Sequence, residues 1–262
     1  MTLTIFSLEE LWRWLFLTVR LSALLLALPL FNTRMLPTAL KVICLVTLSV
    51  SFYPIVQQQP VPIPLGPVHL GLLVLGELLV GLLIGFVAQL LFAGIQLGGE
   101  LLNQQMGLSL ATILDPQNGQ QSSVISNFQY ILAVLLFFAM HAHHWFILAM
   151  AESLHTIPLL GSTLPTTVVA FLVVTLTKAF VAAVQIAAPI IAALLLANVG
   201  MGIVARLVPQ MNVFILSFPV TIGAGLLMLI GTLPYYSGIL RGLFGQLQSS
   251  MRTIIQLLGG AG

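Results

Sequence analysis

The sequence predicts an all-α membrane protein of about six long apolar helical segments, arranged as bent hairpins, followed by a C-terminal amphipathic helix. Three observations lead to this fold class. Of the 262 residues, 59% are apolar and only 5% are charged, whereas soluble domains carry roughly 25% charged residues. Several apolar stretches are as long as the about 20 residues that a helix needs to cross a bilayer. Proline- and glycine-containing breaks separate these stretches.

The charges also exclude several classes of function. The net charge of +2 is small and scattered, which argues against a nucleic-acid partner. The single Cys44 cannot form an internal disulfide. No nucleophile–base arrangement or phosphate-binding loop is present, so neither an enzyme nor a cofactor is expected.

The apolar segments are expected at about 14–31, 36–56, 68–97, 128–151, 168–205 and 211–233. The first lacks the basic region and small-residue cleavage site of a signal peptide, so it is expected to remain as a membrane segment. A proline-rich connector at 57–67 cannot be helical. Asp115-Pro116-Gln117-Asn118-Gly119 is a strong turn signal.

Two segments are too long for a simple span. Helices over 68–97 and 168–205 would measure about 45 and 57 Å, against a hydrocarbon core of about 30 Å. Each segment must therefore tilt, project from the membrane or break. In the second, Pro189 and the pair Gly200 and Gly202 are candidate break points.

Residues 235–258 differ from the segments before them. Their apolar residues recur at three- and four-residue steps, with Arg241, Gln248 and Arg252 on the other side. This pattern predicts an amphipathic helix. Such a helix lies at the membrane interface or packs on a partner helix. The alternative is that it packs within the chain.

Three charges lie inside apolar runs: Arg20, Glu77 and Lys178. Each costs about 2.5–3.5 kcal/mol at a helix centre on insertion scales. Such residues usually pair or face a cavity, and Glu77 and Lys178 are a candidate pair. A structural pair or a contact to a partner subunit is favoured over an ion path, which usually needs more carboxylates.

The histidines do not predict a metal site. His141, His143 and His144 end an apolar run beside Trp145, as in an interfacial belt. Glu152-x-x-His155 has ligand spacing, but a bridged metal site needs a second such pair and further glutamates.

Glycines are concentrated in one long segment. Gly81 and Gly85, and then Gly94 and Gly98, have the Gly-x-x-x-Gly spacing that lets helix backbones approach closely. The pattern favours a subunit of an assembly over a monomer surrounded by lipid.

Three stretches together resemble the FliR family of flagellar export-gate proteins, and more distantly its counterparts in virulence type III secretion. They are the segment from Gly76-Glu77 through Glu100 to Gln105-Met106-Gly107, the turn Asp115–Gln120, and Arg206-Leu-Val-Pro209-Gln210-Met-Asn212-Val-Phe214. The Arg-x-x-Pro-Gln-x-Asn-x-Phe core is the most specific motif. The resemblance runs over essentially the whole chain and is closer to the flagellar branch.

The resemblance implies a subunit of a helical gate that passes unfolded flagellar proteins across the bacterial inner membrane at the basal body. Its partners would be P-type and Q-type subunits and the B-type switch protein. Residues 1–165 would be P-like and residues 166–262 a Q-like hairpin. The chain itself would perform no chemistry.

The resemblance also assigns site residues. A plug of the closed pore would lie at 106–122, with Met106, Gly107, Asp115, Pro116, Gln117, Asn118, Gly119 and Gln120. Subunit interfaces or structural polar contacts are expected at Glu77, Glu100, Lys178, Arg206, Pro209, Gln210, Asn212 and Phe214. On the residues alone, an ordinary surface loop is the alternative interpretation of this segment.

Two rival functions remain. A secondary transporter would have broken helices around Glu77 and Lys178 and an internal repeat, but the two halves show no repeat. A membrane metalloenzyme would rest only on the histidine cluster.

Overall fold

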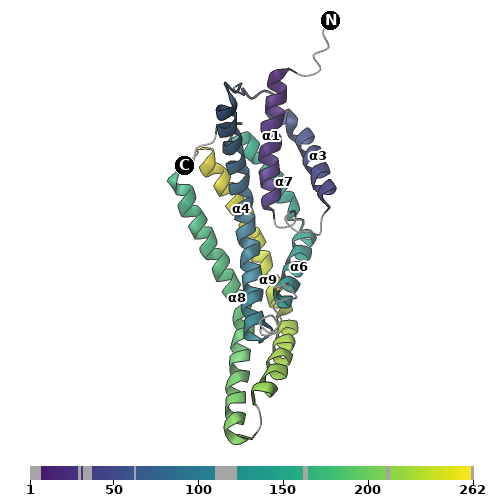
Figure 1. Ribbon diagram of the computed structural model, residues 1–262, viewed down its shortest axis with the longest axis vertical. Helices are drawn as coiled ribbons and strands as arrows, with labels where there is room; N and C mark the ends of the chain where they lie inside the picture. Colours follow the sequence, from purple (N-terminus) through teal and green to yellow (C-terminus); the bar gives the residue numbers. More distant parts are fainter. Residues whose placement is uncertain are drawn as a thin grey trace. The chain divides into compact units, whose positions relative to one another are not determined.

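The computed structural model describes residues 7–28, 31, 37–61, 63–109, 123–161, 165–210 and 213–260, without the side chains of residues 213–215. Within these residues the chain forms seven α-helices and no β-strand (Figure 1). The helices are α1 (Leu8–Ala27), α3 (Thr38–Val56), α4 (Pro67–Gln105), α6 (Val124–Ala139), α7 (His143–Thr156), α8 (Thr166–Leu207) and α9 (Val213–Leu258).

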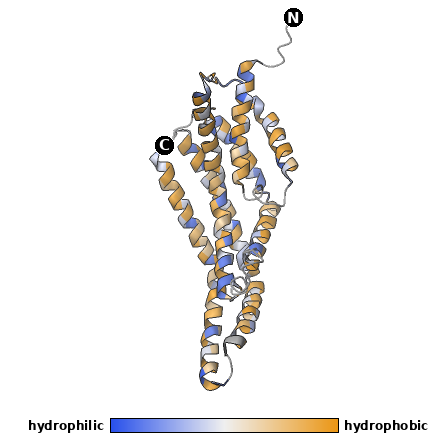
Figure 2. Cartoon of the chain, in the orientation of Figure 1, coloured by the Kyte–Doolittle hydropathy of each residue, from blue (hydrophilic) through white to orange (hydrophobic). Residues whose placement is uncertain are grey.

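Four helices are long and apolar enough to cross a membrane: α3, α4, α8 and α9. The bent pair α6 and α7 makes a fifth if the two helices count as one span. Apolar residues cover most faces of the helices in Figure 2, as lipid or neighbouring subunits require. The all-helical membrane fold is confirmed.

The first helix begins earlier than its apolar run. The Ser7 hydroxyl accepts from the backbone N–H of Glu10, and the Glu10 carboxylate accepts from the backbone N–H of Ser7. This capping box satisfies two N–H groups that would otherwise lack partners at the helix start. The Ser-x-x-Glu pattern is visible in the sequence, but hydropathy alone placed the start near residue 14.

The apolar segment expected at 128–151 is present, but it consists of two helices with a bend of 70° between them rather than of one. Helix α6 ends at Ala139 and α7 starts at His143. Between them His141 has a φ of 55°, a left-handed conformation that cannot continue a right-handed helix. The bend therefore comes from one residue inside an apolar run.

The two C-terminal segments form one helix, since α9 continues through Pro219 and Pro234. Helix α8 likewise continues through the candidate break points Pro189, Gly200 and Gly202, so of the three alternatives for this long segment it does not break. Proline is tolerated in membrane helices because side chains, water or neighbouring helices can satisfy the carbonyl that loses its N–H partner.

The amphipathic pattern at 235–258 is explained by packing within the chain. Its apolar positions are buried: Leu240, Phe244, Leu247, Met251, Ile254, Ile255 and Leu258 are each at most 1% exposed. Gln248 is half-buried, while Arg241 and Arg252 are exposed. The apolar side of this stretch is therefore not a free surface.

The chain divides into two compact units. The first comprises residues 1–90, 141–176 and 245–262, and the second comprises residues 91–140 and 177–244. Helices α4, α8 and α9 contribute residues to both. In the first unit α1 and α3 lie side by side (Figure 1), and α1 buries Phe16, Leu17, Leu21 and Leu24 completely.

The second unit contains α6, the C-terminal part of α4 and the hairpin of α8 and α9 (Figure 1). An aromatic group forms one part of its interior, with ring centroids of Phe92, Tyr130, Phe137 and Phe244 separated by 5.5–6.0 Å in the contacting pairs. An aliphatic cluster forms another part, with Leu102, Met106, Ile125, Ala187, Ile190, Leu194 and Leu229.

Candidate functional site

A buried ion pair lies in the interior of the first unit. Arg20 on α1 and Glu77 on α4 have side chains that are 0% and 1% exposed. Arg20 Nε donates to Glu77 Oε2 over 2.5 Å, and Nη2 donates to Oε1 over 3.0 Å. This two-point geometry is the strongest that a carboxylate and a guanidinium can form. Glu77 thus pairs with Arg20 rather than with Lys178, the partner that the sequence suggested.

The remaining donors of Arg20 hold the segment that follows α7. Arg20 donates to three main-chain carbonyls, at Ser153 (3.2 Å), Ile157 (2.7 Å) and Pro158 (3.2 Å). The backbone N–H of Leu160 donates to Glu77 Oε1 over 2.6 Å. All five guanidinium N–H groups therefore have acceptors, and the pair joins three separate stretches of chain.

Two glycines permit the approach of α1 and α4 that this pair requires. A Cβ at Gly81 would collide with the backbone carbonyl of Arg20, and one at Gly85 would collide with Ala27. Because Gly81 lies one helical turn after Glu77, the close contact at Gly81 brings the carboxylate within reach of Arg20. The first Gly-x-x-x-Gly pair thus lies against α1.

Gln59 adds a second polar contact to the same segment. Its Nε2 donates to the carbonyl of Leu154 over 2.9 Å, and its Oε1 accepts from the N–H of Leu159 over 3.0 Å. Arg13 Nε in turn donates to the carbonyl of Gln59 over 3.1 Å. Nothing in the sequence marks Arg13 or Gln59 as site residues, because their partners are backbone atoms about a hundred residues away or in a connector.

The second unit is held by close packing rather than by charge. A Cβ at Gly94 would lie 2.5 Å from the carbonyl oxygen of Ala179, and one at Gly98 would lie 3.0 Å from that of Ala183. The second Gly-x-x-x-Gly pair therefore lies against the backbone of α8. Glu100 is half-buried on α4, and no salt bridge involves it in the described part of the chain.

The start of the predicted plug is packed on α9. Met106 is fully buried, and a Cβ at Gly225 would lie 2.7 Å from its side chain. Thr221 Oγ1 lies 3.3 Å from the Met106 carbonyl, to which it donates. Gly107 has a φ of 80°, which favours glycine, and a Cβ there would lie 3.1 Å from the ring of Phe218. The residues that directly follow α4 are therefore packed against α9.

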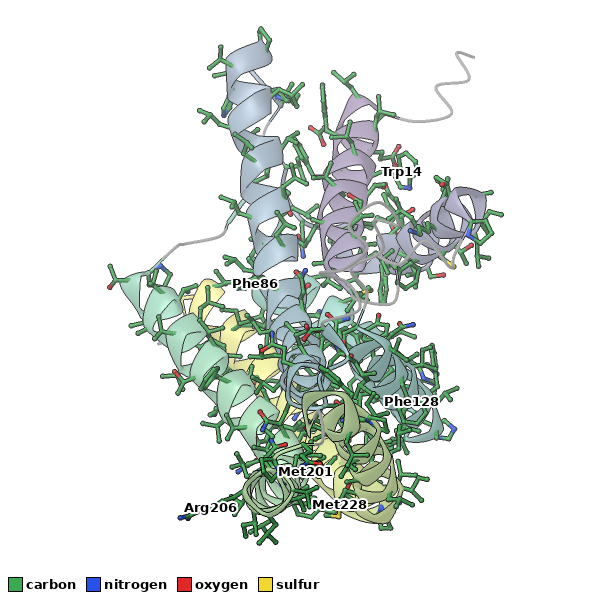
Figure 3. All side chains as sticks on the ribbon, turned by 60° about the horizontal axis from the view of Figure 1, so that its bottom comes forward. Trp14, Phe86, Phe128, Met201, Arg206 and Met228 are labelled. Atoms are coloured by element: carbon green, nitrogen blue, oxygen red, sulfur yellow. The ribbon has the colours of Figure 1, made fainter. Side chains whose placement is uncertain are left out.

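The other predicted interface residues lie near the turn between α8 and α9. Arg206, Pro209 and Gln210 are exposed, and Figure 3 shows Arg206 projecting from the end of α8. Asn212 and the plug residues Asp115 to Gln120 lie outside the described residues, as does the side chain of Phe214.

The histidines cluster at the bend between α6 and α7. The ring centroids of His143 and His144 are 4.3 Å apart, and His141 lies 5.8 Å from His144. Across the described ranges, no group of three or more His, Cys, Asp or Glu side chains has the arrangement of a metal site. Glu152 lies 3.5 Å from Arg252 in an exposed ion pair.

The polar centre of the first unit is built for structure rather than for ion movement. Both oxygens of Glu77 accept hydrogen bonds, and every N–H of Arg20 is used. A proton or ion carrier needs a group that exchanges partners with water. This arrangement gives the transporter hypothesis no support.

Comparison with known proteins gives one consistent result. Residues 11–247 match a family described as bacterial export proteins, family 1. The chain is 31% identical to the flagellar biosynthetic protein FliR of Bacillus subtilis over 94% of this chain and 95% of that protein. It is 33% identical to FliR of Pectobacterium carotovorum (92% and 91% covered) and 30% identical to FliR of Escherichia coli (92% and 91% covered).

Proposed function

The chain belongs to bacterial export proteins, family 1, as a FliR-type protein, and we propose that it forms part of the pore of the flagellar protein export gate. The family is one of export proteins rather than of enzymes, and the three relatives named above are flagellar biosynthetic proteins. The gate passes unfolded flagellar proteins across the inner membrane at the basal body. The observation that carries the proposal is the extent of the family match. It covers all seven described helices except the start of α1 and the end of α9.

The proposed partners are the P-type and Q-type gate subunits and the B-type switch protein. Residues 1–165 would take a P-like position and residues 166–262 a Q-like position in the ring. The long apolar helices α3, α4, α8 and α9 support this assignment. In each of them, the chain itself buries less than half of the most apolar stretch. Such surfaces need either lipid or neighbouring subunits.

We assign the plug of the closed pore to residues 106–122. A plug must occupy the lumen and yet move, and the turn-forming residues Pro116, Asn118 and Gly119 of this segment suit that role. The contacts of Met106 and Gly107 with α9 support the proposal, because a loop that moves needs a fixed point at its base.

Deletion of the gene tests the function. A deletion strain should neither swim nor export a hook-type substrate, and expression of the unchanged chain should restore both. Intact swimming and export in the deletion strain would contradict the proposal. Export lost together with a virulence effector instead of a flagellar substrate would place the chain in the virulence branch.

Shortening the loop tests the plug. Removal of residues within 110–120 should raise leakage of small solutes across the cell membrane, while the gate still assembles. Unchanged permeability in an assembled gate would count against the plug assignment.

A further inference from the structure

One face of α8 in the second unit is exposed along a regular seam. Its residues follow alternating three- and four-residue steps and are all exposed: Lys178, Val181, Gln185, Ala188, Ala192 and Leu195. We call this set the Lys178 seam. This spacing is the one by which a helix packs against a second helix, and its alanines permit close approach.

The opposite face of the same helix is already occupied. Ala182, Ala183, Ile186, Ala187, Ile190 and Leu194 are each at most 3% exposed, and the backbone at Ala179 and Ala183 lies against the glycines of α4. Helix α8 therefore has one seam filled by its own unit and one left open. The open seam is the more polar of the two.

The charge on the seam is unbalanced. Lys178 is exposed, and no salt bridge involves it among the described residues. The described part of the second unit has one carboxylate, Glu100, and three cations, Lys178, Arg206 and Arg241. An ammonium on an apolar helix face is costly in lipid unless a counter-charge faces it.

A lipid headgroup is poorly placed to supply that counter-charge. Lys178 lies twelve residues after Thr166, the first residue of α8, or about 18 Å along the helix. The 27 residues from Ala179 to Ala205 carry no charge. Since half of a hydrocarbon core is about 15 Å, an α8 that starts at one interface places Lys178 near the bilayer centre.

We propose that the Lys178 seam binds an apolar helix of another membrane subunit, which places a carboxylate opposite Lys178. Alanine positions on the seam admit the partner backbone, and Gln185 adds a second polar contact within one helical repeat. The choice of P-type and Q-type subunits as candidates rests on the proposed function. The requirement for a carboxylate rests on Lys178 alone.

Photo-crosslinking in cells tests this surface without assuming the partner. A photo-reactive amino acid replaces Val181 in the full chain, and adducts are compared for the unchanged chain, K178R, K178M and K178E. The adduct to one membrane protein should persist in K178R and fall at least about tenfold in K178E, since truncating or reversing one member of a buried charge pair is costly. R241E, which changes an exposed cation outside the seam by the same charge, should retain the adduct within about twofold.

Charge exchange then identifies the partner group. In the K178E chain, changing one intramembrane carboxylate of the captured protein to lysine should restore the adduct, and no other carboxylate should do so. Absence of any adduct, equal adducts in K178M, K178E and the unchanged chain, or failure of every exchange would overturn the proposal. An adduct to a protein other than a gate subunit, with a successful exchange, would uphold the seam and contradict the proposed function.

Discussion

The two units solve the problem of holding apolar helices together in opposite ways. The first unit has a buried, fully bonded ion pair, Arg20 with Glu77, which also binds the segment after α7. The second unit has glycines of α4 packed against the backbone of α8, and none of its cations forms a salt bridge with another described residue. The ion pair of the first unit has every guanidinium N–H and both carboxylate oxygens bonded, and the second unit presents a charged open seam.

This difference follows from what stabilises helices in an apolar environment. Between helices in lipid there is little hydrophobic driving force, so close packing and interhelical polar contacts decide association. A unit stabilised by a paired charge fixes its own geometry, whereas a unit whose seam lysine has no salt bridge within the described ranges depends on a neighbour. The contrast therefore predicts which substitutions damage the chain alone and which damage only its assembly.

Breaking the ion pair should have the largest effect. Glu77→Ala leaves the Arg20 guanidinium buried without a counter-charge, which costs about 3–5 kcal/mol. We expect little folded chain in size-exclusion profiles of detergent extracts. The matched control is Glu152→Ala, since the Glu152–Arg252 pair has side chains 34% and 57% exposed and exposed pairs contribute at most about 1 kcal/mol.

A double replacement sharpens this prediction. Arg20→Met combined with Glu77→Leu removes both charges and should recover much of the folded yield, because apolar replacement of a whole buried pair is often near neutral. Three backbone carbonyls would still lose a donor, so full recovery is not expected. Equal yields for Glu77→Ala and Glu152→Ala would contradict the role of the pair.

Adding a methyl group to the glycine contact of the second unit should have an intermediate effect. In Gly94→Ala the new Cβ meets the carbonyl oxygen of Ala179 at 2.5 Å, and overpacking of this kind costs about 1–3 kcal/mol. The apparent melting temperature of the purified chain should fall. Gly231→Ala is the control, because nothing lies within 4 Å of its Cβ position and alanine favours the helix; a similar fall in both variants would contradict the packing role.

Backbone strain at Gly107, where the chain leaves α4, should have the smallest effect on the stability of the chain. Its effect on the gate should be specific. Gly107→Ala places a side chain at a φ of 80°, which costs about 1–2 kcal/mol, and its Cβ meets the Phe218 ring at 3.1 Å. We expect a modest loss of thermal stability and greater leakage of small solutes. Gly223→Ala, with open space around its Cβ, should change neither quantity; leakage raised equally by both variants would count against a fixed loop base.

Hydropathy predicted the bounds of a helix well where an uninterrupted apolar run was enough to define it. Helix α8 was expected at 168–205 and runs from Thr166 to Leu207, and α3 was expected at 36–56 and runs from Thr38 to Val56. The bend at His141 was missed because a single left-handed residue leaves no trace in the apolar pattern around it. The continuity of α9 was missed because Pro234 reads as a helix breaker, although membrane helices tolerate proline.

The buried polar contacts of Arg20 and Glu77 show a different limit of prediction from the sequence. The sequence identified Arg20, Glu77 and Lys178 as charges that needed explanation, and two of the three proved to be partners. It had no means of choosing Arg20 over Lys178 as the partner of Glu77, because pairing across 57 residues depends on which helices meet. The backbone carbonyls at Ser153, Ile157 and Pro158 were beyond reach, since any residue type can supply a carbonyl.

The mobility of a spin label at Leu195 shows whether partner subunits fill the Lys178 seam of the second unit. Leu195 is 53% exposed, and replacing Cys44, the single cysteine, makes the label unique. If they do, the nitroxide spectrum should be mobile in the purified chain alone and immobilised in the complex with the P-type and Q-type subunits. The same mobile spectrum in both samples would contradict that prediction.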